Sequence, residues 1–224
     1  MTVLYEPLNH KSRTLFLEQL NPVFSNLYNL IDFQMNPAGR AIHQPGYGFA
    51  CKGGIDQCNS MRLQVCTLDF FWNDGNNYTD PIRQEVFEFI VCTFKNRKLQ
   101  NVMDAAELCS EQFLEADAWW TIHGCYIDGT GEALLGEYVE EAQSTIADIE
   151  HHNIPILQIN GVEVNDTDLK NVKKLICDNF VSANSILAPM SLHYRLWIRM
   201  TTTLQIIASL TSPQKSKSKF TTKQ

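Results

Sequence analysis

Seven cysteines in a chain of 224 residues constrain the fold more than any other feature of the sequence. Cysteines at this density indicate either a disulfide-bonded protein of an oxidising compartment or a set of metal ligands. The sequence contains no Cys-x-x-Cys pair and no cysteine–histidine cluster with zinc-finger spacing, so disulfides are favoured over structural zinc and no metal site is predicted. Because the number is odd, at least one thiol is left without a partner in the chain. The cysteines are Cys51, Cys58, Cys66, Cys92, Cys109, Cys125 and Cys177.

The composition predicts a globular protein with one main domain. Hydrophobic residues make up 44% of the chain and aromatic residues 10%, which is enough apolar surface to offset the entropy of folding. A formal net charge of −7 argues against a nucleic-acid partner, because phosphate neutralisation needs an excess of Lys and Arg. The sequons that begin at Asn77 and Asn165 are candidate glycosylation sites. Together with the cysteines they favour a secreted protein, with the lysosome as the alternative.

The first part of the chain predicts a strand, a helix and a second strand. Residues 3–5 form a short β-prone run, and from Asn9 onward apolar residues recur at helical spacing. Pro22 predicts a kink or an early end of this helix, because proline removes a backbone donor and clashes with the preceding turn. Residues 31–35 have the mixed pattern of a second strand.

The rest of the chain predicts a loop, a helical middle and a hairpin. Asn160-Gly161 between two apolar runs is the strongest hairpin signal in the sequence. The complete order is β-α-β, helical region, β-β-α, which places the protein in the α/β class. The predicted segments are a Gly- and Pro-rich loop over 37–54, helices over 81–94, 102–120 and 131–138, the hairpin over 154–164 and a helix over 169–180.

The segment C51-K-G-G-I-D-Q-C58, followed by Met61 and Cys66, resembles the signature C-Q-H-G-x2-E-C-x2-N-x4-C of the gamma-interferon-inducible lysosomal thiol reductases. Its three cysteines and Gly54 lie at the family's spacing. The family's other four polar positions are occupied here by Lys52, Gly53, Gln57 and Met61. Insects have secreted members of this family, and the chain resembles a form that lacks the redox motif, such as one of mosquito saliva.

The resemblance implies a thioredoxin-like domain over residues 1–190 with a large helical, cysteine-containing insertion at about 51–150. It also implies that Ile154–Pro155 is a cis peptide bond beside the redox site. The six cysteines from Cys51 to Cys125 are then the disulfide candidates, with their pairing open, and Cys177 is the candidate unpaired thiol.

The family's redox Cys-x-x-Cys corresponds to Asn9-His10-Lys11-Ser12 in this chain. Disulfide exchange needs a thiolate, which neither Asn9 nor Ser12 supplies. We therefore expect no enzymatic activity and no cofactor, and interpret the protein as a redox-inactive relative that acts by binding other proteins, at host or parasite surfaces and in immune modulation. Asn9 is instead suited to cap the helix. The alternative is a residual thiol–disulfide oxidoreductase that uses a non-standard cysteine pair.

The C-terminal region is predicted to be a helical extension over 191–211 and a basic, disordered tail over 212–224. Arg195 and Arg199 interrupt the apolar part of the extension, so no membrane span is predicted. The lysines of the tail either keep it solvated or attract anionic glycans. Two aromatic runs, Phe70-Phe71-Trp72 and Trp119-Trp120, are expected in the core, with a binding patch as the alternative.

Overall fold

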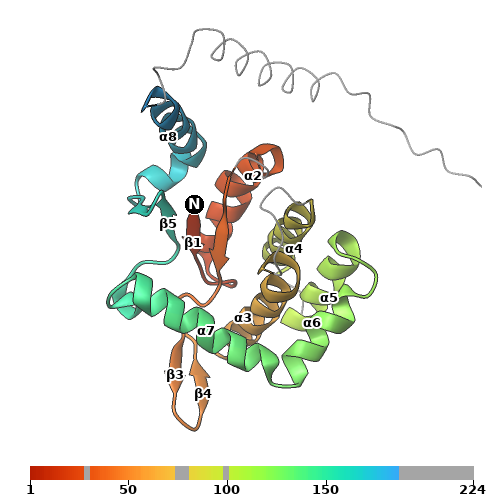
Figure 1. Cartoon of the computed structure of the whole chain (residues 1–224). Helices are drawn as coiled ribbons and strands as arrows, with labels where there is room; N and C mark the ends of the chain where they lie inside the picture. Colours follow the sequence, from red (N-terminus) through yellow and green to blue (C-terminus); the bar gives the residue numbers. More distant parts are fainter. Residues whose placement is uncertain (28–30, 74–80, 98–100, 187–224) are drawn as a thin grey trace, which may run out of the picture. The chain divides into compact units, whose positions relative to one another are not determined.

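The computed structural model describes residues 1–27, 31–73, 81–97 and 101–186 (Figure 1). The chain divides into two compact units, Met1–Ile176 and Cys177–Gln224. Of the second unit, only residues 177–186 are described, and they belong to α8 (Val172–Ile186). The predicted extension over 191–211 and tail over 212–224 lie outside the described residues, and so does Asn77.

The first unit contains a small mixed sheet of four strands. Its strands are β1 (Thr2–Leu4), β2 (Gln34–Asn36), β5 (Ile156–Ile159) and β6 (Val162–Glu163), in the order β2-β1-β5-β6. β1 runs parallel to β2 and antiparallel to β5, so Val3 lies between Met35 and Leu157. Val3 and Leu157 are fully buried, which explains why an apolar run so short forms the centre of the sheet. The mixed α/β class predicted from the sequence is confirmed.

The Asn-Gly turn forms the hairpin that the sequence predicts. β5 and β6 pair antiparallel, with Ile159 opposite Val162. Asn160 and Gly161 both adopt positive φ values, 53° and 78°, which is the backbone of a two-residue turn matched to the twist of the strands.

The helix after β1 continues past Pro22 instead of ending before it. It consists of α1 (His10–Thr14), a π-helical segment η1 (Leu15–Leu20) and α2 (Asn21–Leu27). The wider π turns directly precede the proline, which lies at the second position of α2. Because a π segment relaxes the spacing between a residue and the carbonyl one turn earlier, the chain accommodates Pro22 without a break.

A second departure from the predicted elements is a hairpin inside the segment expected to be a loop. β3 (Ile42–Gln44) and β4 (Gly48–Ala50) pair antiparallel, with His43 opposite Phe49. The Tyr47 amide closes the turn on the Gln44 carbonyl at 2.9 Å, and Gly46 adopts a φ of 80° there. The Gly and Pro residues mark this turn and did not exclude strands around it.

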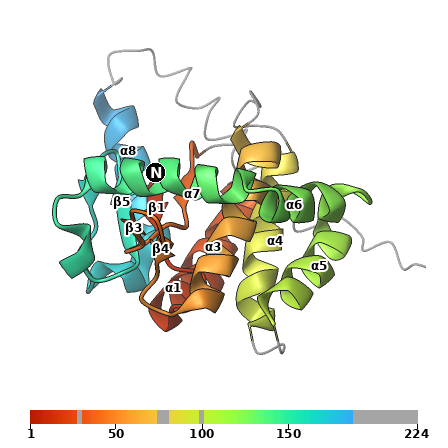
Figure 2. The ribbon, with the colours of Figure 1, turned by 90° about the horizontal axis from the view of Figure 1, so that it is seen from below.

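The regular elements described between β4 and β5 are all helices, and α3, α4, α5 and α6 lie side by side with α7 across α3 (Figure 2). The single helix expected over 102–120 is two helices, because Leu114 adopts an extended conformation that ends the first of them. The elements are α3 (Ile55–Leu68), the π segment η2 (Asp69–Asn73), α4 (Ile82–Asn96), α5 (Val102–Phe113), α6 (Ala118–Ile127), α7 (Thr130–Thr145) and the 3-10 turn η3 (Ile149–His151). A further 3-10 turn, η4 (Asp168–Asn171), follows β6 and precedes α8.

Aromatic side chains join the sheet, the first helix and α4 in one core. The ring centroids of Tyr5 and Phe16 are 4.6 Å apart, and those of Phe16 and Phe94 are 4.8 Å apart. Phe24 lies 4.3 Å from Phe87 by the same measure. These rings are all nearly or fully buried, so packing fixes η1 and α2 against α4 and against the residue that follows β1.

Candidate functional site

The start of α1 is held by Asn9 and Ser12, the two residues that the sequence resemblance leads us to expect at the redox positions. Asn9 is the N-cap: its Oδ1 accepts hydrogen bonds from the amides of Lys11 at 2.8 Å and Ser12 at 3.3 Å. The Ser12 side chain is fully buried, and its Oγ accepts a bond of 3.2 Å from the Glu6 amide. Both polar side chains therefore satisfy backbone donors of the helix and of the loop before it.

Glu6 belongs to the loop that precedes α1 and fixes it through its buried carboxylate. Its carboxylate receives two hydrogen bonds of 2.8 Å from the Arg40 guanidinium and one of 3.0 Å from Asn9 Nδ2. Burial by itself raises the pKa of Glu6, but the hydrogen bonds from Arg40 and Asn9 and the charge of Arg40 outweigh it, so this pKa lies below its usual value. The pairing of Glu6 with Arg40 was not predicted from the sequence, because an ion pair between residues 34 positions apart leaves no local pattern.

Pro155 lies across from the start of α1. The Ile154–Pro155 peptide bond is cis, and both residues are buried at the entry to β5. The backbone groups of Asn153 and Ile154 make no hydrogen bond to other residues in the described part of the chain. These backbone groups are therefore not used for pairing within the described part of the chain.

A pocket of about 510 Å³ separates these two elements. His10, Lys11 and Thr14 line it from α1, and residues 153–155 line it from the opposite side. Leu15, Ile154 and Leu169 supply apolar surface, whereas the charged side chains of Lys11, Glu18, Asp166 and Lys170 surround it and are exposed. An apolar floor with charges of both signs at the rim suits a polypeptide segment better than a strongly anionic small molecule.

Six cysteines form three disulfides: Cys51–Cys58, Cys66–Cys125 and Cys92–Cys109. The prediction of a disulfide-bonded protein is confirmed. Cys177 is unpaired and exposed. The separations in sequence are 7, 59 and 17 residues, so the bonds close loops of very different length.

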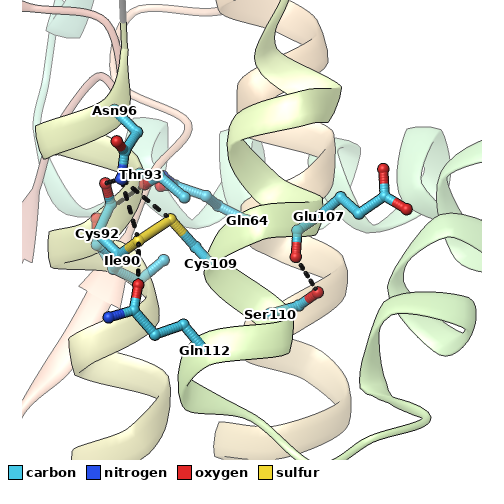
Figure 3. Close-up of a disulfide and its surroundings, with 9 residues drawn as sticks. All are labelled: Gln64, Ile90, Cys92, Thr93, Asn96, Glu107, Cys109, Ser110 and Gln112. Atoms are coloured by element: carbon cyan, nitrogen blue, oxygen red, sulfur yellow. Dashed lines mark hydrogen bonds between the residues drawn. A yellow bond between two sulfur atoms is a disulfide. The ribbon is translucent and has the colours of Figure 1, made fainter. Parts of the chain in front are cut away.

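The Cys92–Cys109 disulfide joins α4 to α5 in the interior (Figure 3). Cys92 is 3% exposed and Cys109 is fully buried. Asn96 Nδ2 donates to the Cys92 carbonyl at 3.1 Å and to Cys92 Sγ at 3.3 Å, so the last residue of α4 lies against the disulfide (Figure 3). Such a bond is protected from thiols in solution.

The aromatic runs divide between core and surface. Trp72 and Trp119 are buried, as expected, whereas Trp120 is 70% exposed on α6. Adjacent residues of a helix point in different directions, which separates Trp119 from Trp120.

No group of three or more His, Cys, Asp or Glu side chains suited to a metal ion occurs among the residues that the structure describes. None of the described helices combines the length and the apolar character that a membrane crossing requires.

The fold and site define a disulfide-bonded protein of mixed α/β architecture, with a pocket where a helix start faces a cis proline. The family model described as gamma interferon inducible lysosomal thiol reductase (GILT) matches residues 1–113 of the 224. The chain belongs to this family, as the cysteine signature predicted.

Two curated relatives support the family assignment at low identity. The chain is 22% identical over 185 residues to a gamma-interferon-inducible lysosomal thiol reductase-like protein of Anopheles gambiae, covering 79% of this chain and 75% of that protein. It is also 22% identical over 178 residues to the gamma-interferon-inducible lysosomal thiol reductase of Carassius auratus, covering 78% of this chain and 64% of the relative.

The expectation that the protein is not an enzyme is corrected by these matches. Both the family and the Carassius auratus relative carry the name of thiol reductases, so the family membership indicates a thiol-reductase-related function. The expectation equated the missing sulfurs at Asn9 and Ser12 with the loss of thiol chemistry from the whole chain. That step does not follow for a protein with seven cysteines.

Proposed function

We propose that this protein is a secreted, thiol-reductase-related protein that binds extended polypeptide segments of partner proteins in the pocket beside Pro155. The observation that carries the proposal is the pocket itself, where the unpaired backbone of Asn153 and Ile154 faces the first turn of α1. An extended segment would pair with this backbone and place its side chains over Leu15 and Leu169.

The sheet and the helix after β1 support the finer assignment of a thioredoxin-like fold, with the helices from α3 to α7 as its insertion. Three disulfides and the exposed sequon at Asn165 support a secretory history, which fits release from the cell or delivery to the lysosome. Action at host or parasite surfaces and in immunity, and capture of anionic glycans by the tail, rest on the resemblance and on charge alone.

Binding of an unfolded polypeptide tests the proposal. The probe is a fluorescein-labelled insulin B chain whose cysteines have been carboxymethylated, so that no thiol chemistry contributes to the signal. Thr14→Tyr places a ring in the pocket and should weaken binding by about tenfold, as measured by fluorescence anisotropy.

Thr121→Tyr is the matched control, because it makes the same change at an exposed threonine of α6. It should bind the labelled chain as the unaltered protein does. Equal binding by the Thr14 and Thr121 variants, or no binding by the unaltered protein, would overturn the assignment of this pocket.

A further inference from the structure

We propose that the Cys51–Cys58 disulfide is the exchangeable redox pair of this protein. The inference deepens the proposed function, because it assigns the thiol chemistry of a thiol-reductase relative to a pair that borders the residues preceding α1.

Accessibility distinguishes this pair from the other two disulfides. Cys51 is half-buried and is followed by five exposed residues, 52–56. In contrast, Cys66, Cys92, Cys109 and Cys125 are all 4% exposed or less. Disulfide exchange begins with an in-line attack of a thiolate on sulfur, so the attacking group needs an open approach. Of the three disulfides in the described part of the chain, Cys51–Cys58 is the one that directly adjoins an exposed loop.

Cys58 is suited to leave as a thiolate. It lies in the first turn of α3, a helix of 14 residues, and its amide bonds to the Gly54 carbonyl at 3.3 Å. The partial positive charge at a helix N-terminus favours a thiolate there, and a better leaving group speeds exchange. Lys52 adds a positive charge in the same loop and Asp56 a negative one, and both side chains are exposed. Cys58 is 2% exposed, so the attack is directed at Cys51.

The disulfide loop is fixed against the residues that precede α1. Gln57, which is 2% exposed, accepts a hydrogen bond of 3.0 Å from the Leu8 amide through its Oε1. A Cβ at Gly53 would come within 2.9 Å of the Gln57 Cβ, so glycine at this position lets the loop close on Gln57. Leu8 precedes the cap residue Asn9, and His10 and Lys11 line the pocket. The loop and the pocket therefore border the same stretch of chain, residues 8–11.

The reduction step uses a dithiol as the electron donor. One thiolate of the dithiol attacks Cys51 Sγ, the Cys51–Cys58 bond breaks, and Cys58 leaves as a thiolate while Cys51 forms the mixed disulfide. The second thiolate of the dithiol then attacks its own sulfur in that mixed disulfide and releases the Cys51 thiolate. The dithiol is oxidised to a disulfide, and two electrons have passed to the protein.

The reverse sequence reduces a polypeptide disulfide. The Cys51 thiolate attacks one sulfur of the bound polypeptide, and the other sulfur leaves as a thiolate. The Cys58 thiolate then attacks Cys51 in the mixed disulfide, which restores the Cys51–Cys58 bond. The polypeptide leaves with two thiols after taking up protons from water.

Graded reduction of the full chain tests the proposal without any substitution. The protein is equilibrated with increasing dithiothreitol at neutral pH, quenched with iodoacetamide and mapped by mass spectrometry, with exposed Cys177 as the marker of complete alkylation. Cys51 and Cys58 should become alkylated at about tenfold less dithiothreitol than the other four cysteines. Reduction of a buried pair at the same or lower concentration overturns the proposal.

Turnover of insulin disulfides with dithiothreitol as donor tests the function of the pair. Cys51→Ser with Cys58→Ser should remove the rate above the donor alone, whereas Cys177→Ser should leave it unchanged. Asn9→Cys with Ser12→Cys serves as the positive control at the family's usual positions. Absence of turnover by the unaltered chain, or full turnover by the Cys51/Cys58 variant, contradicts the inference.

The two proposals fail separately. The Cys51/Cys58 variant should still bind the carboxymethylated insulin B chain, because that assay involves no thiol. If the variant loses turnover but still binds the chain, the result supports the redox pair. If it loses both turnover and binding, the substitution has disturbed the fold. The graded reduction of the unaltered chain then decides the matter.

Discussion

Asn9 Nδ2 donates a hydrogen bond of 3.0 Å to Oε2 of the buried Glu6, while Asn9 Oδ1 caps the first turn of α1. One amide side chain thus satisfies both the helix and the loop before it. The residue expected at the position of a redox cysteine is therefore part of the hydrogen-bonding framework of the fold.

Replacement of Asn9 by alanine should lower the free energy of unfolding by about 1 to 2 kcal/mol, the range for loss of an N-cap. Asn101→Ala is the matched comparison, since Asn101 caps α5 but its Nδ2 bonds Asp104 at the exposed surface. The Asn9 variant should be the less stable of the two in urea titrations, because it also removes a donor from a buried carboxylate. Equal losses would show that the bond to Glu6 contributes nothing.

The Glu6–Arg40 pair should make stability depend on pH in the acid range. The pKa of Glu6 is lowered in the folded protein by hydrogen bonds and charge that outweigh its burial. Its contribution is therefore fully present above the unfolded pKa of about 4.3 and is lost as the pH falls through the lower folded value. Denaturant midpoints measured between neutral and strongly acidic pH should fall less steeply in Glu6→Gln than in the unaltered protein. Parallel curves would argue against this role for Glu6.

Two glycines of α7 should respond to alanine with opposite signs. A Cβ at Gly131 would lie 2.9 Å from Cys66 Sγ and 3.2 Å from the Cys125 carbonyl, so Gly131→Ala pushes against a disulfide and should cost about 1 to 3 kcal/mol. At Gly136 the nearest neighbour is Phe49 Cζ at 3.7 Å, an ordinary contact. Gly136→Ala should therefore stabilise by about 0.5 to 1 kcal/mol through helix propensity. Thermal unfolding of both variants checks the prediction, which fails if the signs agree.

The disulfides should differ in their contribution to stability according to loop length. The chain-entropy model gives about 4 kcal/mol for Cys66–Cys125, which spans 59 residues, and about 2.5 kcal/mol for Cys51–Cys58, which spans 7. Serine replacement of each pair, followed by chemical unfolding, should rank the two variants in this order. The reverse order would mean that packing around Cys51 and Cys58 outweighs chain entropy.

Asn165 should carry an N-linked glycan when the chain is made in a eukaryotic secretory pathway. It is exposed in the turn before η4, and its carbonyl accepts the amides of Asp168 and Leu169 at 2.8 and 3.2 Å. Treatment with an N-glycosidase should increase the electrophoretic mobility of the unaltered protein. The increase should be smaller for Asn165→Gln, and an identical shift in both would exclude Asn165 as the acceptor.

Local features of the sequence determined the elements whose interactions span only a few residues. Asn9 was recognisable as a cap because its partners are the amides two and three positions later. Asn160-Gly161 predicted its hairpin for the same reason. Both residues of the turn need a positive φ, which asparagine and glycine tolerate. The spacing of Cys51, Cys58 and Cys66 likewise predicted the family from the sequence alone.

Only the tertiary structure decided the relationships between distant segments. Which cysteines pair, which carboxylate Arg40 binds, and how Gln57 reaches Leu8 all depend on how the helices pack. The cis bond at Pro155 was expected from the family resemblance and not from its local sequence, and the pocket beside it exists only because α1 and residues 153–155 meet in space. A side chain 34 or 59 positions away leaves no periodic trace in the sequence, because burial and packing are properties of the folded chain as a whole.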